Sequence, residues 1–241
     1  MRILVTRPEP DASREADKLA ALGHQAVLAP LLAIESIGGV ELQLDGAQAV
    51  LATSRNALRA LATHRGLGEA LRLPLFAVGE TTAREAQALG FADVTAGPGT
   101  GSALAKLVGE ELQPDQGALV HLAGETLAFD LKAALAKQGF AVRQPVLYRA
   151  VSAHAFPAEA LRSLKAERLD GAILMSPRTA RIFADLLTRE AVVTQARRIV
   201  CYCLSEAVAE VLVPLGFAVR VATRPREEEV LALLSSEAPS S

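Results

Sequence analysis

Predicted β-strands and α-helices alternate along the whole chain, and this order constrains the fold more than any other feature of the sequence. The first pair is an apolar strand at 3–6 and a helix that is capped by Asp11 or Ser13 and ends at Leu22, before Gly23. The last pair is a strand at 219–222 and a helix at 227–234. A repeating strand–helix order predicts an α/β protein whose parallel sheets are wrapped by helices.

One strand–helix unit has the features of an anion-binding site. The apolar strand Leu75–Val78 is followed by Gly79, which we expect to allow a sharp turn. Thr81 and Thr82 stand where a helix is predicted to begin, and threonine is a favoured N-cap residue. The helix then runs to Gly90. Free backbone N–H groups at such a helix start can bind an anion, although strand–helix units without a ligand share this pattern.

Composition and length exclude several classes of protein. The chain has 241 residues and is 51% hydrophobic, which is sufficient for one or two packed domains. A net charge of -2 and an aromatic content of 4% argue against a nucleic-acid-binding surface. The apolar runs are too short to span a bilayer, and Met1–Arg7 is too short for a signal-peptide core. We therefore expect a cytoplasmic protein that does not contact membranes, with a frayed tail at 237–241.

The two cysteines do not predict a disulfide or a metal site. Cys201 and Cys203 are two residues apart on a predicted strand, a spacing that seldom reaches disulfide geometry. The sequence has no matched pair of histidines to complete a zinc site. We expect both cysteines to be reduced thiols in or near the core.

Polar and glycine residues recur at the ends of the predicted strands, where an open parallel sheet binds its ligands. Together with Gly79, Thr81 and Thr82, the following residues are substrate-binding candidates: Arg7, Ser54, Arg55, Asn56, Gly124, Ser176, Arg178 and Ser205. Ser54 and Ser176 are also expected to cap helices, and Arg7 has an equally plausible role as a solvated loop residue.

Two further strand ends lead into predicted helices. The glycine-rich loop at 96–101 lacks the spacing of a dinucleotide-binding site, and Ser102 is the expected N-cap of the helix after it. The helix after Glu125 is predicted to run to Gln138, before Gly139.

A degenerate internal repeat predicts two related lobes. Leu51–Ala57 resembles Leu174–Ala180, because in both an apolar strand ends in serine and a helix with a nearby arginine follows. A second motif follows each copy, at Gly79 and at Ser205. The same number of residues separates Gly79 from Gly90 and Ser205 from Gly216. Matching order and offsets favour two similar lobes over one larger sheet.

The two N-terminal strands are too few to form a lobe, so we expect them to join the C-terminal half. Lobe 1 is then residues 1–34 plus 152–241, and lobe 2 is the inserted segment 38–147. The chain crosses between the lobes at 32–37 and 146–151. Both crossings are predicted to be extended, so they can pair as a two-stranded β-ribbon hinge. The strand ends are expected to face one another across a cleft between the lobes.

The sequence resembles the uroporphyrinogen-III synthase family over nearly its whole length. The resemblance rests on Val5–Pro8, Thr53–Ala57, Val78–Ala83 with Gly90, Val146–Tyr148 and Met175–Arg178. It implies two flavodoxin-like α/β lobes joined by the ribbon hinge. It also implies a monomeric, cofactor-free hydro-lyase of tetrapyrrole (haem) biosynthesis. Its substrate is hydroxymethylbilane, which it cyclises to uroporphyrinogen III with loss of water and inversion of the last ring.

The resemblance also implies roles for individual residues. Tyr148 is the catalytic candidate, which would hydrogen-bond the departing hydroxyl; the alternative is a tyrosine that only packs on the ribbon. Substrate carboxylates would be held by helix N-termini rather than by a large positive charge. Because the tetrapyrrole itself stabilises the cation formed on loss of hydroxide, the protein would act mainly by positioning the substrate's ends.

Two stretches depart from the family pattern. The second copy of the Gly79 motif has Ser205 in place of glycine and apolar Ala207 and Val208 in place of threonines. Glu125–Asp130 lacks the basic residue that many relatives carry there. Two alternatives therefore stay open: a catalytically weakened paralogue, and a two-lobed protein that closes on a small ligand without chemistry.

Overall fold

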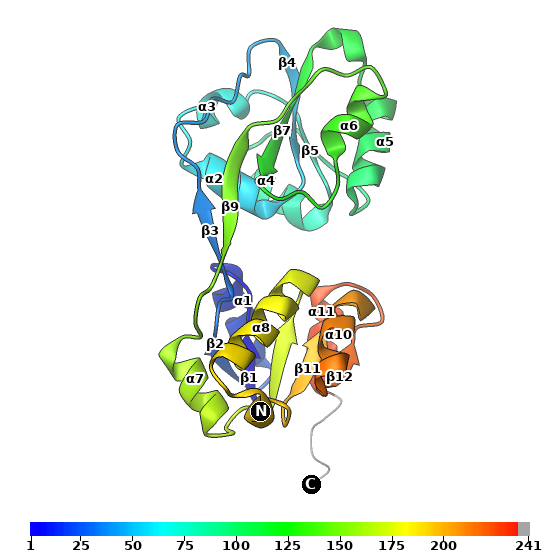
Figure 1. The fold of residues 1–241 in the computed structure, drawn as a ribbon. Coiled ribbons are helices and arrows are strands. Elements are labelled where there is room, and N and C mark those ends of the chain that lie inside the picture. The colour runs from blue at the N-terminus through cyan, green and yellow to red at the C-terminus, as the bar shows by residue number, and fades with distance from the viewer. Residues whose placement is uncertain (236–241) are drawn as a thin grey trace. The chain divides into compact units, whose positions relative to one another are not determined.

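The structure is a computed structural model that describes residues 1–235, so the predicted tail at 237–241 lies outside the described residues. The chain divides into two compact units (Figure 1). Unit 1 comprises Met1–Ala33 and the chain from Val151 onward, and unit 2 comprises Ile34–Ala150. These divisions lie within a few residues of the predicted lobes, whose independence as folding domains stays a prediction.

Unit 1 contains a five-stranded parallel sheet with the order β12-β11-β10-β1-β2. Its strands are β1 (Arg2–Val5), β2 (Gln25–Leu28), β10 (Gly171–Leu174), β11 (Val200–Cys203) and β12 (Ala218–Val221). The helices that flank it are α1 (Asp11–Ala21), α7 (Ala158–Lys165), α8 (Pro177–Arg189), α9 (Val193–Ala196), α10 (Glu206–Leu212) and α11 (Glu227–Ser235). Strand β10 is buried along its whole length, as expected for a strand covered by helices on both faces.

Unit 2 is built on a sheet with the order β3-β9-β7-β4-β5-β6, in which β8 also pairs with β7. Its strands are β3 (Leu32–Ser36), β4 (Ala47–Ala52), β5 (Leu75–Ala77), β6 (Val94–Ala96), β7 (Ala118–Gly124), β8 (Val142–Arg143) and β9 (Val146–Ser152). Its helices are α2 (Arg55–Ala62), α3 (Leu67–Ala70), α4 (Glu80–Leu89), α5 (Gly101–Glu111) and α6 (Leu131–Ala136). The chain passes between the units within β3 and within β9, and these two strands are hydrogen-bonded neighbours. The predicted α/β class with two helix-wrapped parallel sheets is confirmed.

The two sheets have the same spatial arrangement but a different chain order. In unit 1, β10, β11 and β12 step outward in sequence, with β1 and β2 on the other side. In unit 2, β4, β5 and β6 step outward in the same way, with β7 and β8 on the other side. The two-strand half therefore comes first in the chain of unit 1 and last in that of unit 2. Each sheet reverses its strand order at one point, between β10 and β1 or between β4 and β7, and α/β proteins bind ligands at such points.

The equivalent strand ends agree with the predicted repeat. Ser54 follows β4 and Ser176 follows the equivalent β10, while Gly79 and Ser205 follow β5 and β11. Ser54 and Ser176 are confirmed as helix caps, because their Oγ atoms accept hydrogen bonds from Asn56 N and Thr179 N at 3.1 Å. Ser205 occupies the N-cap position of α10, but its side chain makes no capping hydrogen bond.

The prediction that Thr81 or Thr82 caps α4 is wrong. Helix α4 begins at Glu80 with Gly79 in the N-cap position, so both threonines lie in the first turn. Gly79 is also fully extended, with φ of -175°, so it does not provide a sharp turn. A Cβ atom there would lie 3.2 Å from Gly99 Cα, and this close approach is a better reason for a glycine. Gly90 ends α4 with a left-handed φ of 111°, as predicted.

Three other helix starts differ from the prediction. Helix α1 has Pro10 in its N-cap position rather than Asp11 or Ser13. Thr100 rather than Ser102 caps α5, and its Oγ1 accepts a hydrogen bond from Ala103 N at 3.2 Å.

The third difference lies after β7, where the helix predicted to follow Glu125 begins only at Leu131. Asp130 is its N-cap, and Asp130 Oδ1 accepts a hydrogen bond from Ala133 N at 2.9 Å. Residues 125–130 consequently form a loop at the carboxyl end of β7.

Two expectations about the chain as a whole can be compared with the structure. Cys201 and Cys203 are buried and free, as predicted, and burial raises the pKa of the Cys203 thiol to about 12. Among the helices of residues 1–235, none combines the length and the hydrophobicity needed to cross a membrane.

Candidate functional site

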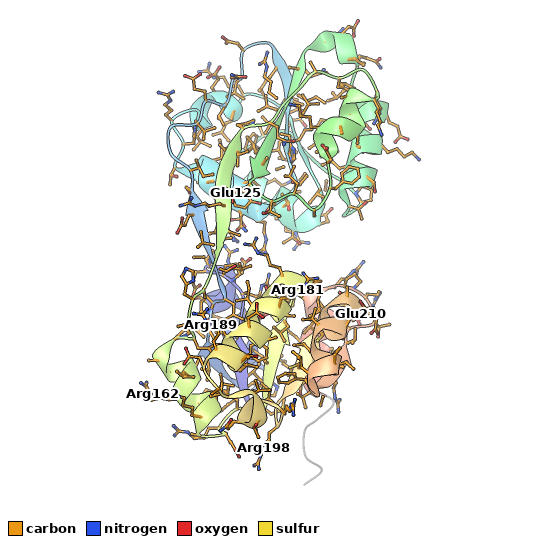
Figure 2. All side chains as sticks on the ribbon, viewed as in Figure 1. Glu125, Arg162, Arg181, Arg189, Arg198 and Glu210 are labelled. Atoms are coloured by element: carbon orange, nitrogen blue, oxygen red, sulfur yellow. The ribbon has the colours of Figure 1, made fainter. Side chains whose placement is uncertain are left out.

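A cavity of about 600 Å³ lies at the carboxyl edge of the unit 2 sheet. Its walls are Thr53 and Ser54 after β4, Val78 after β5, residues 99–102 after β6, Gly124 at the end of β7, residues 126–129 after β7, and Tyr148 of β9. The loop that begins with Glu125, labelled in Figure 2, forms one side of it. The cavity thus lies at the carboxyl ends of the neighbouring strands β4 and β7, the point at which the strand order reverses.

The cavity is lined by hydroxyl groups and by apolar side chains. The hydroxyl groups come from Thr53, Ser54, Thr100, Ser102, Thr126 and Tyr148. Val78, Leu127, Ala128 and Phe129 supply the apolar part, and none of the described lining residues carries a charged side chain. Helix α5 begins here with Gly101 and Ser102, so its first N–H groups lie beside the hydroxyls, whereas α2 contributes only its N-cap residue Ser54. Such a surface can hold carboxylates by hydrogen bonds and helix N-termini while it covers a flat apolar ring.

Gly124 provides the space that Tyr148 occupies. The two residues are paired across β7 and β9, and Glu125 N donates to Tyr148 O at 2.9 Å. A Cβ atom on Gly124 would lie 2.5 Å from Tyr148 Cζ and 2.8 Å from its hydroxyl oxygen. Any larger residue at 124 would therefore displace the phenol ring, so the glycine fixes where the hydroxyl lies.

A buried histidine orients another hydroxyl of the cavity. His121 of β7 is fully buried, and burial, only partly offset by its hydrogen bond to Gln144, lowers its pKa. Its Nδ1 lies 3.2 Å from Gln144 Oε1, an acceptor, so Nδ1 carries the proton. His121 Nε2 then accepts from Thr53 Oγ1 at 3.1 Å. With its proton committed to His121, the Thr53 hydroxyl can still accept a hydrogen bond from an N–H group in the cavity.

The structure brings three of the predicted site residues of unit 2 together and leaves the others outside the cavity lining. Ser54, Gly124 and Tyr148 line the cavity. The predicted residues of unit 2 that do not line it are Arg55, Asn56, Gly79, Thr81 and Thr82. Asn56 instead accepts a hydrogen bond from Arg59 Nη1 at 3.0 Å, and Thr82 is buried against the core. Gly79 contributes indirectly, because it packs against Gly99 of the lining loop.

Several cavity residues were missed by sequence reasoning. Thr126, Leu127, Ala128 and Phe129 were assigned to a helix, which hid their position in a loop beside the strand end. The pattern of Asp130 before an apolar run was an N-cap signal that could have placed the helix start correctly.

The predicted site residues of unit 1 stand at the carboxyl ends of its strands. Arg7 follows β1, Ser176 and Arg178 follow β10, and Ser205 follows β11. Thr6, immediately before Arg7, is fully buried, and its Oγ1 donates to Ile173 O at 2.6 Å, which ties β1 to β10.

The Arg7 guanidinium is surrounded by carboxylates of its own unit. It lies 2.9 Å from Glu227 and 3.5 Å from both Asp11 and Glu15. Burial opposes its charge, but the hydrogen bond to Glu227 and the charges of the three carboxylates outweigh burial and raise the pKa of Arg7. The arginine is therefore firmly charged, and a substrate carboxylate would compete with these internal partners for it.

Glu15 and Glu227 respond differently to the same cluster. Glu15 is 1% exposed, its Oε2 has no hydrogen-bond partner, and burial raises its pKa to about 7 despite the nearby Arg7. Burial also disfavours the charge of Glu227, but hydrogen bonds from Lys18, at 2.5 Å, and from Arg7 lower its pKa on balance.

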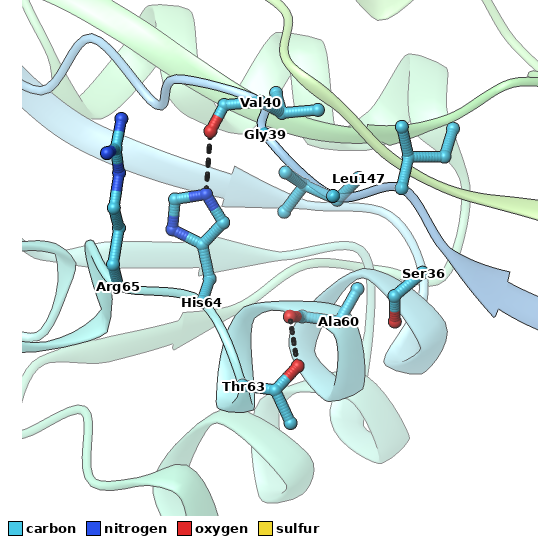
Figure 3. A pocket seen from close by; sticks show the side chains of 10 residues that line it. Ser36, Gly39, Val40, Ala60, Thr63, His64, Arg65 and Leu147 are labelled. Carbon is cyan, nitrogen blue, oxygen red and sulfur yellow. Dashed lines mark hydrogen bonds between the residues drawn. The ribbon is translucent and has the colours of Figure 1, made fainter.

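A second hollow, of about 450 Å³, lies elsewhere in unit 2 (Figure 3). Its lining includes residues 36–40, His64 and Arg65, and it contains none of the predicted site residues. His64 Nε2 lies 2.8 Å from Val40 O, and its Nδ1 accepts from Gly66 N at 2.9 Å. The ring thus holds two backbone segments together, and this engagement favours a structural role.

No group of three or more His, Cys, Asp or Glu within residues 1–235 is arranged to hold a metal ion.

Comparison with known proteins identifies the family. The model of the uroporphyrinogen-III synthase HemD family matches residues 13–232. The chain belongs to the uroporphyrinogen-III synthase family. A search of curated protein sequences finds no match.

Solved structures of the same family share the fold. Uroporphyrinogen-III synthetase from Helicobacter pylori is 20% identical, with a TM-score of 0.67 over 98% of this chain and 99% of that one. A mutant uroporphyrinogen III synthase from the extremely thermophilic bacterium Thermus thermophilus is also 20% identical, with a TM-score of 0.54 over 98% of this chain and 96% of that one.

The Glu15 carboxyl should make the stability of the protein depend on pH. A carboxyl whose pKa is higher in the folded than in the unfolded protein stabilises the fold at low pH, and this contribution is lost as pH rises through the folded value. With values of 4.5 unfolded and about 7 folded, Glu15 should lower the free energy of unfolding by about 2–3 kcal/mol between pH 5 and pH 8.

Urea unfolding at pH 5 and pH 8 measures this effect. Glu15→Gln should remove most of that loss of stability, while Glu228→Gln, at an exposed position of α11, should retain it. An equal change in the free energy of unfolding for the parent protein and Glu15→Gln would contradict the assignment.

Proposed function

We propose that this protein is a uroporphyrinogen-III synthase, which cyclises hydroxymethylbilane to uroporphyrinogen III with loss of water and inversion of the last ring. The observation that carries the proposal is the position of Tyr148. In a chain of this family, its hydroxyl lies in a hydroxyl-lined, uncharged cavity at the switch point of the unit 2 sheet. We further expect a cytoplasmic monomer that needs no cofactor, as the sequence predicts.

The cavity suits the acidic side chains of a tetrapyrrole. Hydroxymethylbilane carries acetate and propionate groups on its pyrroles, while this chain has a net charge of -2. The hydroxyls of Ser54 and Thr100 and the first N–H groups of α5 can bind carboxylates, and a helix N-terminus contributes roughly 0.3–1 kcal/mol at an exposed site. The affinity would therefore come from many modest hydrogen bonds rather than from a cluster of cations.

Tyr148 would assist the departure of the hydroxyl group. The terminal pyrrole pushes electrons toward its carbinol carbon, the C–O bond breaks, and an azafulvene cation forms. The Tyr148 O–H would donate a hydrogen bond to the leaving hydroxide. The proton that the last pyrrole loses when the new C–C bond forms balances this hydroxide as water. The cavity would meanwhile hold the two ends of the chain within reaction distance, so that the new C–C bond forms at the last ring.

A second candidate is a family member that binds the tetrapyrrole but has lost turnover. It is favoured by the α10 start, where Ser205 makes no capping bond and Val208 is fully buried, so this copy of the motif presents no threonine hydroxyl. The first candidate fits the intact Tyr148 and Gly124 pair better.

Product analysis separates the two candidates. The purified protein is incubated with freshly prepared hydroxymethylbilane, the products are oxidised, and the porphyrin isomers are resolved. We expect the type III isomer in excess over the enzyme concentration. Type I alone, the product of spontaneous closure, would contradict the synthase proposal.

Two substitutions test the role of the Tyr148 hydroxyl. Tyr148→Phe removes the proposed donor and should slow type III formation about 5- to 30-fold, as expected for the loss of one hydrogen bond of roughly 1–2 kcal/mol. Gly124→Ala should cause a similar loss by displacing the phenol ring, with little change in melting temperature because the ring can move toward the cavity.

Gly68→Ala is a matched control, because a Cβ atom at position 68 meets nothing within 4 Å. It should leave type III formation unchanged. Full activity of both Tyr148→Phe and Gly124→Ala would show that the Tyr148 hydroxyl has no part in the reaction.

A further inference from the structure

Phe129 is exposed in a protein that buries its other phenylalanines. The chain contains seven phenylalanines, and the six others are at most 6% exposed. Phe129 is 39% exposed and lines the unit 2 cavity, in the loop between β7 and α6. Burying a phenyl side chain contributes about 1.5–3 kcal/mol, so a ligand in the cavity that covered this ring would gain binding free energy.

The ring is held in place by a glycine at the start of α5. A Cβ atom on Gly101 would lie 2.7 Å from Phe129 Cδ1 and 2.9 Å from Phe129 Cγ. The ring therefore packs directly on the Gly101 backbone, where an alanine would push it away. Asp130, the next residue, is fixed as the N-cap of α6, so the loop is anchored immediately after the ring.

The equivalent position in unit 1 is occupied by an ion pair. The loop after β1 is equivalent to the loop after β7, and α11 is equivalent to α5, because the two sheets share one arrangement. In unit 1, Arg7 of that loop pairs with Glu227, the first residue of α11, at 2.9 Å. In unit 2, the contact joins Phe129 with Gly101, the first residue of α5. The equivalent contact between loop and helix is thus an ion pair in unit 1 and a partly exposed phenyl ring packed on a glycine in unit 2.

We propose that Phe129 is a substrate-binding residue that packs its ring against a pyrrole of the bound tetrapyrrole. This inference rests on the proposed function, since it assigns the ring to that substrate. Pyrroles are flat and aromatic, and aromatic pairs prefer offset or edge-to-face contact. The hydroxyl groups of the cavity would hold the substrate carboxylates, and the Thr53 hydroxyl can accept a hydrogen bond from a pyrrole N–H. The apolar lining residues, with Phe129 among them, would cover the faces of the pyrrole rings.

The test compares binding and turnover in a small set of variants. Binding is measured by calorimetry with uroporphyrinogen III under anaerobic, reducing conditions, and turnover by the KM and kcat for type III formation from hydroxymethylbilane. Phe129→Ala should raise both Kd and KM roughly 5- to 20-fold. Phe129→Tyr should restore both values to within about twofold of the parent, since it keeps the ring.

Further variants separate the ring from its apolar volume and from general effects. Phe129→Leu keeps an apolar side chain and should still bind several-fold more weakly than the parent. Gly101→Ala should also weaken binding, because it displaces the ring. Leu28→Ala in β2 is the matched control, because Leu28 is 38% exposed and lies in unit 1. It should bind as the parent does, and melting curves confirm that each variant is folded.

The outcomes distinguish this inference from the proposed function. If the parent makes type III and Phe129→Ala or Phe129→Leu retains the parent Kd and KM, the role of the ring is refuted and the synthase proposal stands. If the parent makes only type I but binds uroporphyrinogen III in a way that depends on Phe129, the synthase proposal fails and the ring contact is supported.

Discussion

The parallel pairing of β4 with β5 and β7 determines where the chemistry of unit 2 is located. Because these strands run in the same direction, the residues that follow them are gathered at one edge of the sheet. Ser54, Val78 and Gly124 reach the same cavity in this way from segments that are far apart in the sequence. The carboxyl edge also carries the starts of α2 and α5, so backbone N–H groups and capping hydroxyls converge there without any cationic side chain in the described lining.

The two units show how one arrangement of strands can be put to different uses. In unit 1, the contact between the loop after β1 and α11 is a cluster of ion pairs, in which Arg7 lies close to Asp11, Glu15 and Glu227. At the carboxyl edge of the unit 2 sheet there are glycines instead: Gly124 leaves space for the Tyr148 ring, and the Phe129 ring packs on Gly101. The contribution of this charged cluster to the stability of unit 1 depends on pH, whereas small residues leave space for a ligand. The candidate site of unit 2 is therefore defined as much by missing side chains as by present ones.

The sequence predicted the architecture well because its signals are local and repeated. Apolar strands, glycine stops such as Gly90 and serine caps such as Ser54 each depend on a few neighbouring residues, and their order alone indicates parallel sheets. Loop structure was harder to predict, because the residues 125–130 have no strong turn signal and Leu127 and Phe129 are compatible with a helix. Close approaches between distant segments, such as Gly124 with Tyr148, depend on strand register and leave no signal in either segment. The ion pairs of Arg7 with Glu15 and Glu227 were missed because they join a loop to two separate helices, and none of these segments alone signals the contact.

The central claim is that the tetrapyrrole binds at the carboxyl edge of the unit 2 sheet. Backbone hydrogen exchange, followed by mass spectrometry with and without saturating uroporphyrinogen III, tests it directly. We expect slower exchange in peptides that cover residues 99–104 and 124–131, where the loops of the cavity meet α5 and α6. Unchanged exchange in these peptides, with protection instead at residues 36–40 and 63–65 around the hollow of Figure 3, would contradict the account.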